Sequence, residues 1–278
     1  MKFGIHAGLW QRAWSDDPAP IMRQAKSLGF DGVELSLLGV GLTDAAALRK
    51  LSGELDLALT CSTGLGAGDD PGSADPERRA AAIATLTNAV RTAGAMGAGN
   101  LSGVVASPWG YYEPARKAER AEYVAESLAK LDSILREEGV VMGIEALNRF
   151  ESDLTNTAAE TQAIAVATGS QNIGVLLDTF HMNVEEKSPP AAIVATGKSL
   201  VHFHISDNDR GVPGSGHYDF KTTAQALSQI GYTGWVMAEM FVTAGNPNSA
   251  DVNIWRNIEA DPTEAARATL SFMQRIFS

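Results

Sequence analysis

Cysteine and basic side chains are scarce in this sequence. The 278 residues include one cysteine, Cys61, which excludes an intramolecular disulfide and fits a reducing compartment. Lysine and arginine number 22 against 33 aspartates and glutamates, so the net charge is −11. An acidic surface repels phosphodiester backbones, and no cluster of basic residues offsets it. We therefore expect no nucleic-acid partner.

Long apolar runs are missing as well. No uninterrupted apolar segment approaches the roughly 20 residues that a membrane-spanning helix needs. The chain begins with Met1-Lys-Phe-Gly-Ile-His6 and enters a strand-like run directly, without the apolar stretch of a signal peptide. With 45% hydrophobic and 20% charged residues, the composition is that of an ordinary globular protein. We expect a soluble, cytoplasmic protein with no membrane partner.

A dinucleotide-binding motif is also absent, because no GxGxxG follows the first strand-like run. Short β-like runs instead alternate eight times with amphipathic segments of helical length. This pattern is typical of an α/β protein of the (β/α)8 TIM-barrel type, for which about 250 residues is usual. No linker or low-complexity tract divides the chain, so we predict a single TIM-barrel domain over residues 1–278.

The pattern predicts the following elements. Strands are expected at Lys2–His6, Gly32–Leu35, Leu57–Ser62, Asn100–Val105, Val140–Glu145, Val175–Asp178, Leu200–His204 and Gly234–Glu239. Helices are expected near Pro18–Leu28, Asp44–Leu55, Pro76–Gly97, Ala115–Glu138, Ala158–Thr168, Pro190–Thr196, Phe220–Ile230 and Pro262–Phe277. Two glycine-containing segments, 28–32 and 230–234, predict a helix end followed by a tight turn.

The last four strand-like runs share an unusual ending. Each apolar run stops at a residue with a carboxylate or an imidazole: Glu145, Asp178, His204 and Glu239. Aspartate is a favoured helix N-cap, so Asp178 alone is equally consistent with capping. Four successive runs with such endings are hard to explain by capping. The repetition predicts that these four side chains share a function.

The fold expectation brings the four side chains together. In a TIM barrel the C-terminal strand ends meet on one face, where active sites lie. Three carboxylates and one imidazole, with no thiolate, suit one hard or borderline divalent cation, with Mn²⁺ first and Co²⁺ or Mg²⁺ as alternatives. A dication would also offset the cost of burying three carboxylates. The alternative, in which one or two of the four are caps or hydrogen-bonding residues, stays open.

Other residues near these strand ends are weaker candidates. His202 and His204 alternate along one strand, and we expect their side chains to point to opposite faces, with His204 as the better ligand. Several aromatic residues in early loops either wall a sugar-sized pocket or pack in the core. These residues are Trp14, Trp109, Tyr111 and Tyr112.

Four segments resemble the signature regions of a known enzyme family. They are Glu145-Ala-Leu-Asn-Arg-Phe-Glu151, Leu177-Asp-Thr-Phe-His-Met-Asn183, His202-Phe-His-Ile-Ser-Asp-Asn-Asp-Arg210 and Met237-Ala-Glu-Met-Phe241. In order and spacing the chain is similar to the ketose 3-epimerases of the D-tagatose and D-allulose (psicose) group, within the xylose-isomerase-like sugar isomerase and epimerase barrels. The chain departs from the family pattern just before Arg210 and in the early loops.

This resemblance implies a function for each matching position. Glu145, Asp178, His204 and Glu239 would bind one divalent metal ion, and Glu145 and Glu239 would also act as the acid/base pair. Substrate contacts would come from Glu151, His181, Arg210 and Trp109. The implied reaction is epimerisation of a free ketose at C3, by deprotonation to an enediolate and reprotonation on the opposite face. The implied assembly is a homodimer or homotetramer.

Several other functions remain open at this point. An aldose–ketose isomerase, a hydroxypyruvate isomerase or an inosose dehydratase would use the same metal site. An endonuclease IV-like nuclease shares the barrel, but five histidines and a charge of −11 argue against its several metals and basic groove. A sugar-binding protein without catalysis is the third class of function.

Overall fold

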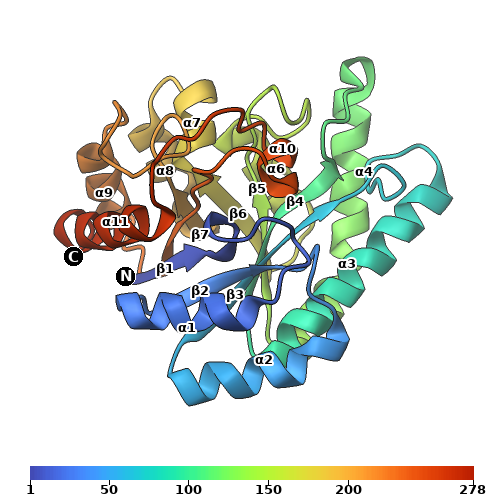
Figure 1. Ribbon diagram of the computed structural model, residues 1–278. Coiled ribbons are helices and arrows are strands. Elements are labelled where there is room, and N and C mark those ends of the chain that lie inside the picture. Colours follow the sequence, from blue (N-terminus) through green and yellow to red (C-terminus); the bar gives the residue numbers. More distant parts are fainter.

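The computed structural model describes all 278 residues, and its eight parallel strands close into a barrel (Figure 1). Neighbouring strands follow chain order, and the last strand pairs with the first. The strands are β1 (Lys2–His6), β2 (Gly32–Ser36), β3 (Ala58–Leu65), β4 (Asn100–Pro108), β5 (Val141–Glu145), β6 (Ile173–Asp178), β7 (Leu200–Ile205) and β8 (Trp235–Ala238). This is the (β/α)8 TIM barrel that the sequence predicted.

Helices surround the barrel (Figure 1). They are α1 (Pro18–Leu28), α2 (Leu42–Leu55), α3 (Pro76–Met96), α4 (Lys117–Ala129), α5 (Asp132–Glu138), α6 (Ala158–Ala167), α7 (Thr179–Glu185), α8 (Pro189–Thr196), α9 (Phe220–Gln229), α10 (Pro247–Asp251) and α11 (Pro262–Ile276). Short 3-10 turns lie at Ala7–Leu9, Pro114–Arg116 and Gly197–Ser199. None of the helices combines the length and the apolar character that crossing a membrane requires.

Aspartate–proline pairs fix where three of these helices begin. Asp17, Asp75 and Asp261 each precede a proline and accept a hydrogen bond from the backbone N–H two residues further on. The carboxylate satisfies a free N–H of the first turn, and the proline ring is already set to a helical φ. At the other end of α1, Gly29 has φ 97°, which confirms the predicted glycine stop.

The helices differ from the prediction in three places. The expected single helix Ala115–Glu138 is divided between α4 and α5, because Lys130 and Leu131 have ψ values of −16° and −9°, too shallow to continue the α-helical ladder. The side chain of Leu131, which lies at this break, is fully buried in the core. The sequence analysis also missed the short helices α7 and α10, which lie directly after a strand end or inside a loop.

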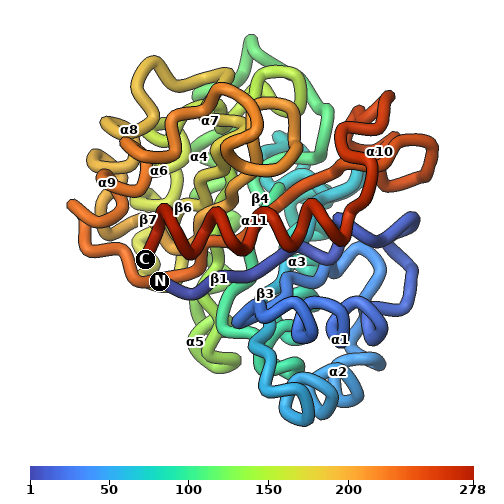
Figure 2. The backbone as a smooth tube through the Cα atoms, turned by 60° about the vertical axis from the view of Figure 1, so that its left-hand side comes forward, coloured from blue at the N-terminus to red at the C-terminus, as the bar shows by residue number.

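A single cluster of 60 buried apolar residues joins the barrel interior to the surrounding helices, so the chain has one main core. A small separate cluster, Phe241, Val252 and Ile254, lies outside it and contacts Trp14 and Trp109. Figure 2 shows α11 lying across β1, and both views place the two chain ends side by side.

Strand register decides which polar side chains become neighbours. Asp178 at the end of β6 is paired with His204 of β7, and His6 of β1 is paired with Glu34 of β2. Every residue of β2 is buried, including the carboxylate of Glu34. The barrel therefore contains two sets of charged groups, one at the C-terminal ends of the strands and another deeper in the barrel interior.

Candidate metal centre and active site

The four predicted strand-end residues converge. Glu145, Asp178, His204 and Glu239 each offer one ligand atom, and these atoms all lie within 4.8 Å of one another. Asp178 is fully buried, and the side chain of Glu239 is 12% exposed. Three carboxylates this close repel one another strongly unless positive charge lies among them. The four residues could hold a metal ion between them.

Asp178 caps a helix and is also a member of the cluster. Its Oδ1 accepts a hydrogen bond from the backbone N–H of Phe180, 2.8 Å away, and so caps α7. Its Oδ2 lies 2.6 Å from Nη1 of Arg210 and belongs to the cluster. Because the cap holds one oxygen, the carboxylate is fixed with the other oxygen toward the centre.

One ring nitrogen of the cluster has no hydrogen-bond partner, and its position indicates whether these residues fit a metal ion. Nδ1 of His204 is buried, makes no hydrogen bond and lies 3.5 Å from Oε2 of Glu239. A buried nitrogen without a partner is costly, and a lone pair aimed among carboxylates is the donor that a divalent cation takes from histidine. The donor set therefore fits one hard or borderline dication.

His181 lies at the edge of the cluster. Its Nδ1 accepts a hydrogen bond from the backbone N–H of Asn148 at 3.1 Å, and its Nε2 lies 3.3 Å from Nη2 of Arg210. Nε2 lies 3.4 Å from Oε1 of Glu145 and lines the pocket. The side chain of Asn148 also donates to Oε1 of Glu151, which joins the two predicted substrate contacts.

Arg210 brings positive charge to the cluster and also lies beside His181, with Nη2 3.3 Å from Nε2 of that ring. Its Nη1 lies 2.6 Å from Asp178 and 2.8 Å from Glu239. The residue has φ 70°, a conformation uncommon for a side chain with a Cβ. Asp207, fully buried, stabilises this loop by accepting backbone hydrogen bonds from Asn208 and Gly214 at 2.8 and 2.7 Å.

A pocket opens at the C-terminal ends of the strands, and Glu145, His204, Arg210 and Glu239 line it. Its empty volume, including the open mouth, is about 540 Å³. The predicted contacts Glu151, His181, Arg210 and Trp109 all line it, and so does Trp14. The other two aromatic candidates do not: Tyr111 contacts Arg78 and Arg120, and Tyr112 is half exposed.

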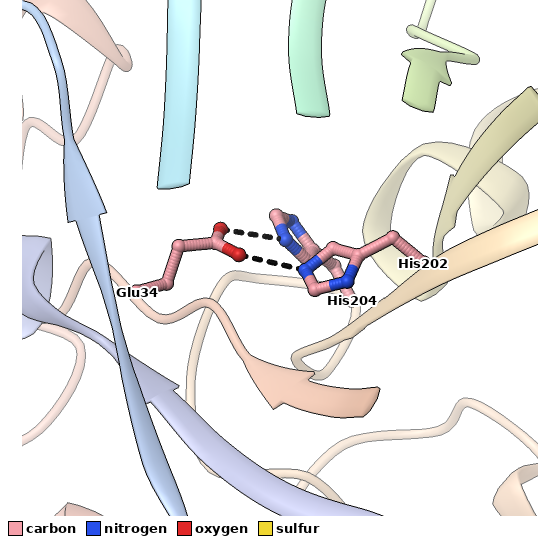
Figure 3. Close-up of side chains that lie close together, drawn as sticks. All are labelled: Glu34, His202 and His204. Atoms are coloured by element: carbon pink, nitrogen blue, oxygen red, sulfur yellow. Dashed lines mark hydrogen bonds and ion pairs between the residues drawn. The ribbon is translucent and has the colours of Figure 1, made fainter. Parts of the chain in front are cut away.

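The prediction that His202 and His204 point to opposite faces was wrong. Residues two apart in a strand share a face, and both rings lie inside the barrel with centroids 5.0 Å apart. Each ring contacts the same carboxylate, that of Glu34 (Figure 3). Glu34 was assigned no function from the sequence, although a charged residue between two apolar residues, Val33 and Leu35, in a strand-like run was a usable signal.

The two glutamates proposed as an acid/base pair have different environments. Burial raises the pKa of Glu145 above its ordinary value, although His181 acts in the other direction. Burial acts on Glu239 in the same way, but His204 and Arg210 hold its pKa well below the usual range. Before any cation binds, Glu145 therefore holds a proton more readily than Glu239 does.

Comparison with known proteins places the chain in a family. Residues 22–276 match the family described as Xylose isomerase-like TIM barrel. The chain belongs to this family. Among curated relatives, D-psicose 3-epimerase of Agrobacterium fabrum (strain C58) is 33% identical over 98% of both chains. L-ribulose 3-epimerase of Methylomonas sp. (strain DH-1) is 32% identical over 99% of this chain and 97% of the relative.

Solved structures agree with this membership of the xylose isomerase-like family. A D-psicose 3-epimerase crystallised in the presence of D-fructose superposes with a TM-score of 0.95 at 32% identity, covering 100% of this chain and 99% of that one. A D-allulose 3-epimerase from Methylomonas sp. in complex with D-allulose gives 0.92 at 30% identity, with coverages of 99% and 97%. The chain is accordingly an enzyme of the isomerase and epimerase class.

Proposed function

We propose that this enzyme epimerises a free ketose at C3 with the help of one divalent cation. The observation that carries the proposal is the cluster of Glu145, Asp178, His204 and Glu239 at the ends of four successive strands. Relatives similar over the whole chain are named D-psicose, L-ribulose and ketose 3-epimerases, which supports a ketose as substrate. Substrates of the D-fructose/D-allulose, D-tagatose/D-sorbose or ribulose/xylulose type are the proposed pairs.

The four cluster residues are the proposed metal ligands. Mn²⁺ is the proposed ion, with Co²⁺ or Mg²⁺ as alternatives, because oxygen donors dominate and a single imidazole completes the set. When bound, the cation supplies a Lewis acid that stabilises negative charge on the ketone oxygen. The unsatisfied Nδ1 of His204 supports its assignment to this set.

Glu145 and Glu239 are the proposed acid/base pair. They come from β5 and β8, which are separated in the barrel by two other strands, so their carboxylates approach the pocket from different directions. One carboxylate removes the proton from C3, which leaves the substrate as an enediolate, and the other returns a proton to the opposite face. The roles are exchanged when the other epimer is the substrate.

Four pocket residues are the proposed substrate contacts. Nε2 of His181 is the ring nitrogen proposed to contact a sugar oxygen, because Asn148 already occupies the other one. Arg210 donates from a buried guanidinium, and Glu151 accepts from a hydroxyl group. Trp109 offers an apolar face to the sugar C–H groups. Together they would hold the reacting end of the ketose beside the two glutamates.

An isotope experiment tests this function. Metal-stripped protein is incubated in D₂O with Mn²⁺, Co²⁺, Mg²⁺ or EDTA and a panel of free ketoses, and the products are separated by chromatography. The proposal predicts metal-dependent conversion between C3 epimers with one deuterium at C3. An aldose with deuterium at C1 or C2 would instead identify an isomerase. The panel includes a 3-keto glycoside, because a 3-dehydro-D-guloside 4-epimerase of Escherichia coli is 29% identical over 82% of the chain.

A further inference from the structure

Glu34 lies beneath the candidate metal centre and reaches across the barrel. It projects from the middle of β2, is completely buried, and contacts two histidines of β7, although β1 and β8 separate these strands (Figure 3). Its Oε2 lies 2.6 Å from Nε2 of His202, and its Oε1 lies 2.9 Å from Nε2 of His204. Thr60 donates a hydrogen bond to Oε2, at 2.8 Å.

The short contact between Glu34 and His202 is a hydrogen bond, which argues against a second metal site at Glu34, His202 and His204. Two ligand atoms of one ion with bonds of about 2.1 Å stand roughly 3 Å or more apart. The 2.6 Å separation between Glu34 and His202 is too short for that and is the length of a strong charge-assisted hydrogen bond. A buried carboxylate that accepts hydrogen bonds from His202 and Thr60, with Nε2 of His204 close to its other oxygen, is also stable without a cation.

The contact with Glu34 determines where His204 has its proton. A nitrogen lone pair directed at a carboxylate oxygen 2.9 Å away would be repelled, so Nε2 must have the hydrogen, even though the contact is not aligned as an ideal hydrogen bond. In neutral imidazole the lone pair is then on Nδ1. Nδ1 is the nitrogen beside Glu239, on the side of the proposed cation.

We propose that Glu34 is a positioning residue for the metal centre, which fixes the ring orientation and the tautomer of His204. This inference rests on the proposed function, because it concerns the cation assigned to Glu145, Asp178, His204 and Glu239. Carboxylates that hold the far nitrogen of a metal-binding histidine fix its tautomer and raise its basicity. His202 and Thr60 act one step further away, by holding the carboxylate of Glu34 in place.

The variant Glu34→Gln separates this function from simple packing. A carboxamide has nearly the same shape, but it offers only one acceptor oxygen to two histidines that both need one. With an N–H₂ group facing it, His204 is forced to move its proton to Nδ1 or to turn away. The Kd for Mn²⁺, measured by titration calorimetry on metal-stripped protein, is expected to rise about 10- to 100-fold. Glu264→Gln, the same exchange on the exposed surface of α11, is the control and is expected to keep a Kd close to that of the wild type.

A second measurement needs neither metal nor substrate. With ¹⁵N-labelled histidine in the metal-free wild-type protein, ring ¹⁵N shifts distinguish a protonated nitrogen from a lone pair, and the chain has only five histidines. We expect a proton on Nε2 of His204 in the wild type and its loss from that position in Glu34→Gln. A lone pair on Nε2 of His204 in the wild type would overturn the inference even if the variant does not fold.

The outcomes also separate this inference from the proposed function. Wild-type protein that binds no divalent cation would contradict the proposed metal centre. Wild-type protein that binds Mn²⁺ while a folded Glu34→Gln variant has the same Kd and the same His204 tautomer would contradict the inference about Glu34 alone.

Discussion

The two halves of the barrel contribute differently to the pocket. Strands β5 to β8 and the loops after them supply every acid, the arginine and two of the histidines that line it. Strands β1 to β4 supply mainly neutral groups, among them Ser62, Thr63, Gly64 and Trp109, with His6 hydrogen-bonded to Ser62 at 2.9 Å. We call β5 to β8 with the loops after them the charged half and β1 to β4 with their loops the neutral half. The charged half has the groups for proton transfer, and the neutral half has the shape and hydroxyl groups that suit recognition of the rest of a sugar.

Removal of the cation should give the largest effect and should affect mainly the charged half. EDTA is expected to reduce epimerisation to background, with recovery on addition of Mn²⁺. Without the cation, the carboxylates at the ends of β5, β6 and β8 repel one another, so backbone hydrogen exchange near Glu145, Asp178 and Glu239 should accelerate more than in β2 to β4. If hydrogen exchange accelerated equally in both halves, the claim that the cation stabilises mainly the charged half would be wrong.

Single glutamate variants should have the next largest effect. Glu145→Gln and Glu239→Gln remove the proposed base or acid with little change of shape, and turnover is expected to fall about 10²- to 10⁴-fold. Metal occupancy is measured in parallel, because both residues are also proposed ligands. Glu264→Gln, on the exposed surface of α11, is the matched control and should retain wild-type turnover. Near-normal turnover in a metal-loaded Glu145 or Glu239 variant would remove the acid/base assignment.

A substitution in the neutral half should change substrate binding alone. Trp109→Ala removes an aromatic face from the pocket, which is expected to raise KM for the ketose roughly tenfold, as lost ring contacts cost about 1 kcal/mol or more. The Kd for Mn²⁺ should stay at the wild-type value, as measured by calorimetry. A large rise in that Kd would show that the two halves are not separable in this way.

The smallest expected effect concerns an ion pair that joins two segments of the charged half. Glu185 on α7 accepts hydrogen bonds from Arg149 at its backbone N, Nε and Nη2, at 2.7, 3.0 and 2.9 Å. Burial acts to raise the pKa of Glu185, but these donors hold it below its ordinary value. A carboxyl group with a lowered pKa in the folded state adds stability above its unfolded pKa, about 4.3, and loses it as the pH falls.

Glu185→Gln tests that ion pair. Because Arg149 is largely exposed, the variant is expected to be only about 0.5–1 kcal/mol less stable than the wild type at pH 7. The difference should shrink as the pH is lowered from 6 toward 3, measured by urea unfolding of the metal-free protein. A difference that grows at low pH would contradict the sign of the pKa shift.

The charged half was also the part that sequence alone predicted well. An apolar run that ends in a charged residue is a local pattern, and the barrel topology then brings such ends together, as for Glu145 and Asp178. The partners of Glu34 could not be predicted in this way, because His202 is 168 positions away and their contact depends on crossing the barrel interior. In the neutral half Trp109 was predicted, but Ser62, Thr63 and Gly64 were missed, because serine, threonine and glycine at a strand end have no pattern that separates them from ordinary loop residues.

The most direct test of the account is the position of the cation itself. Crystals grown with Mn²⁺ would give an anomalous difference peak that locates the ion. We expect one ion per chain, coordinated by Glu145, Asp178, Glu239 and Nδ1 of His204. Glu34 should lie on the far side of the imidazole ring, without a bond to the ion. A peak between Glu34, His202 and His204, or coordination through Nε2 of His204, would contradict the account.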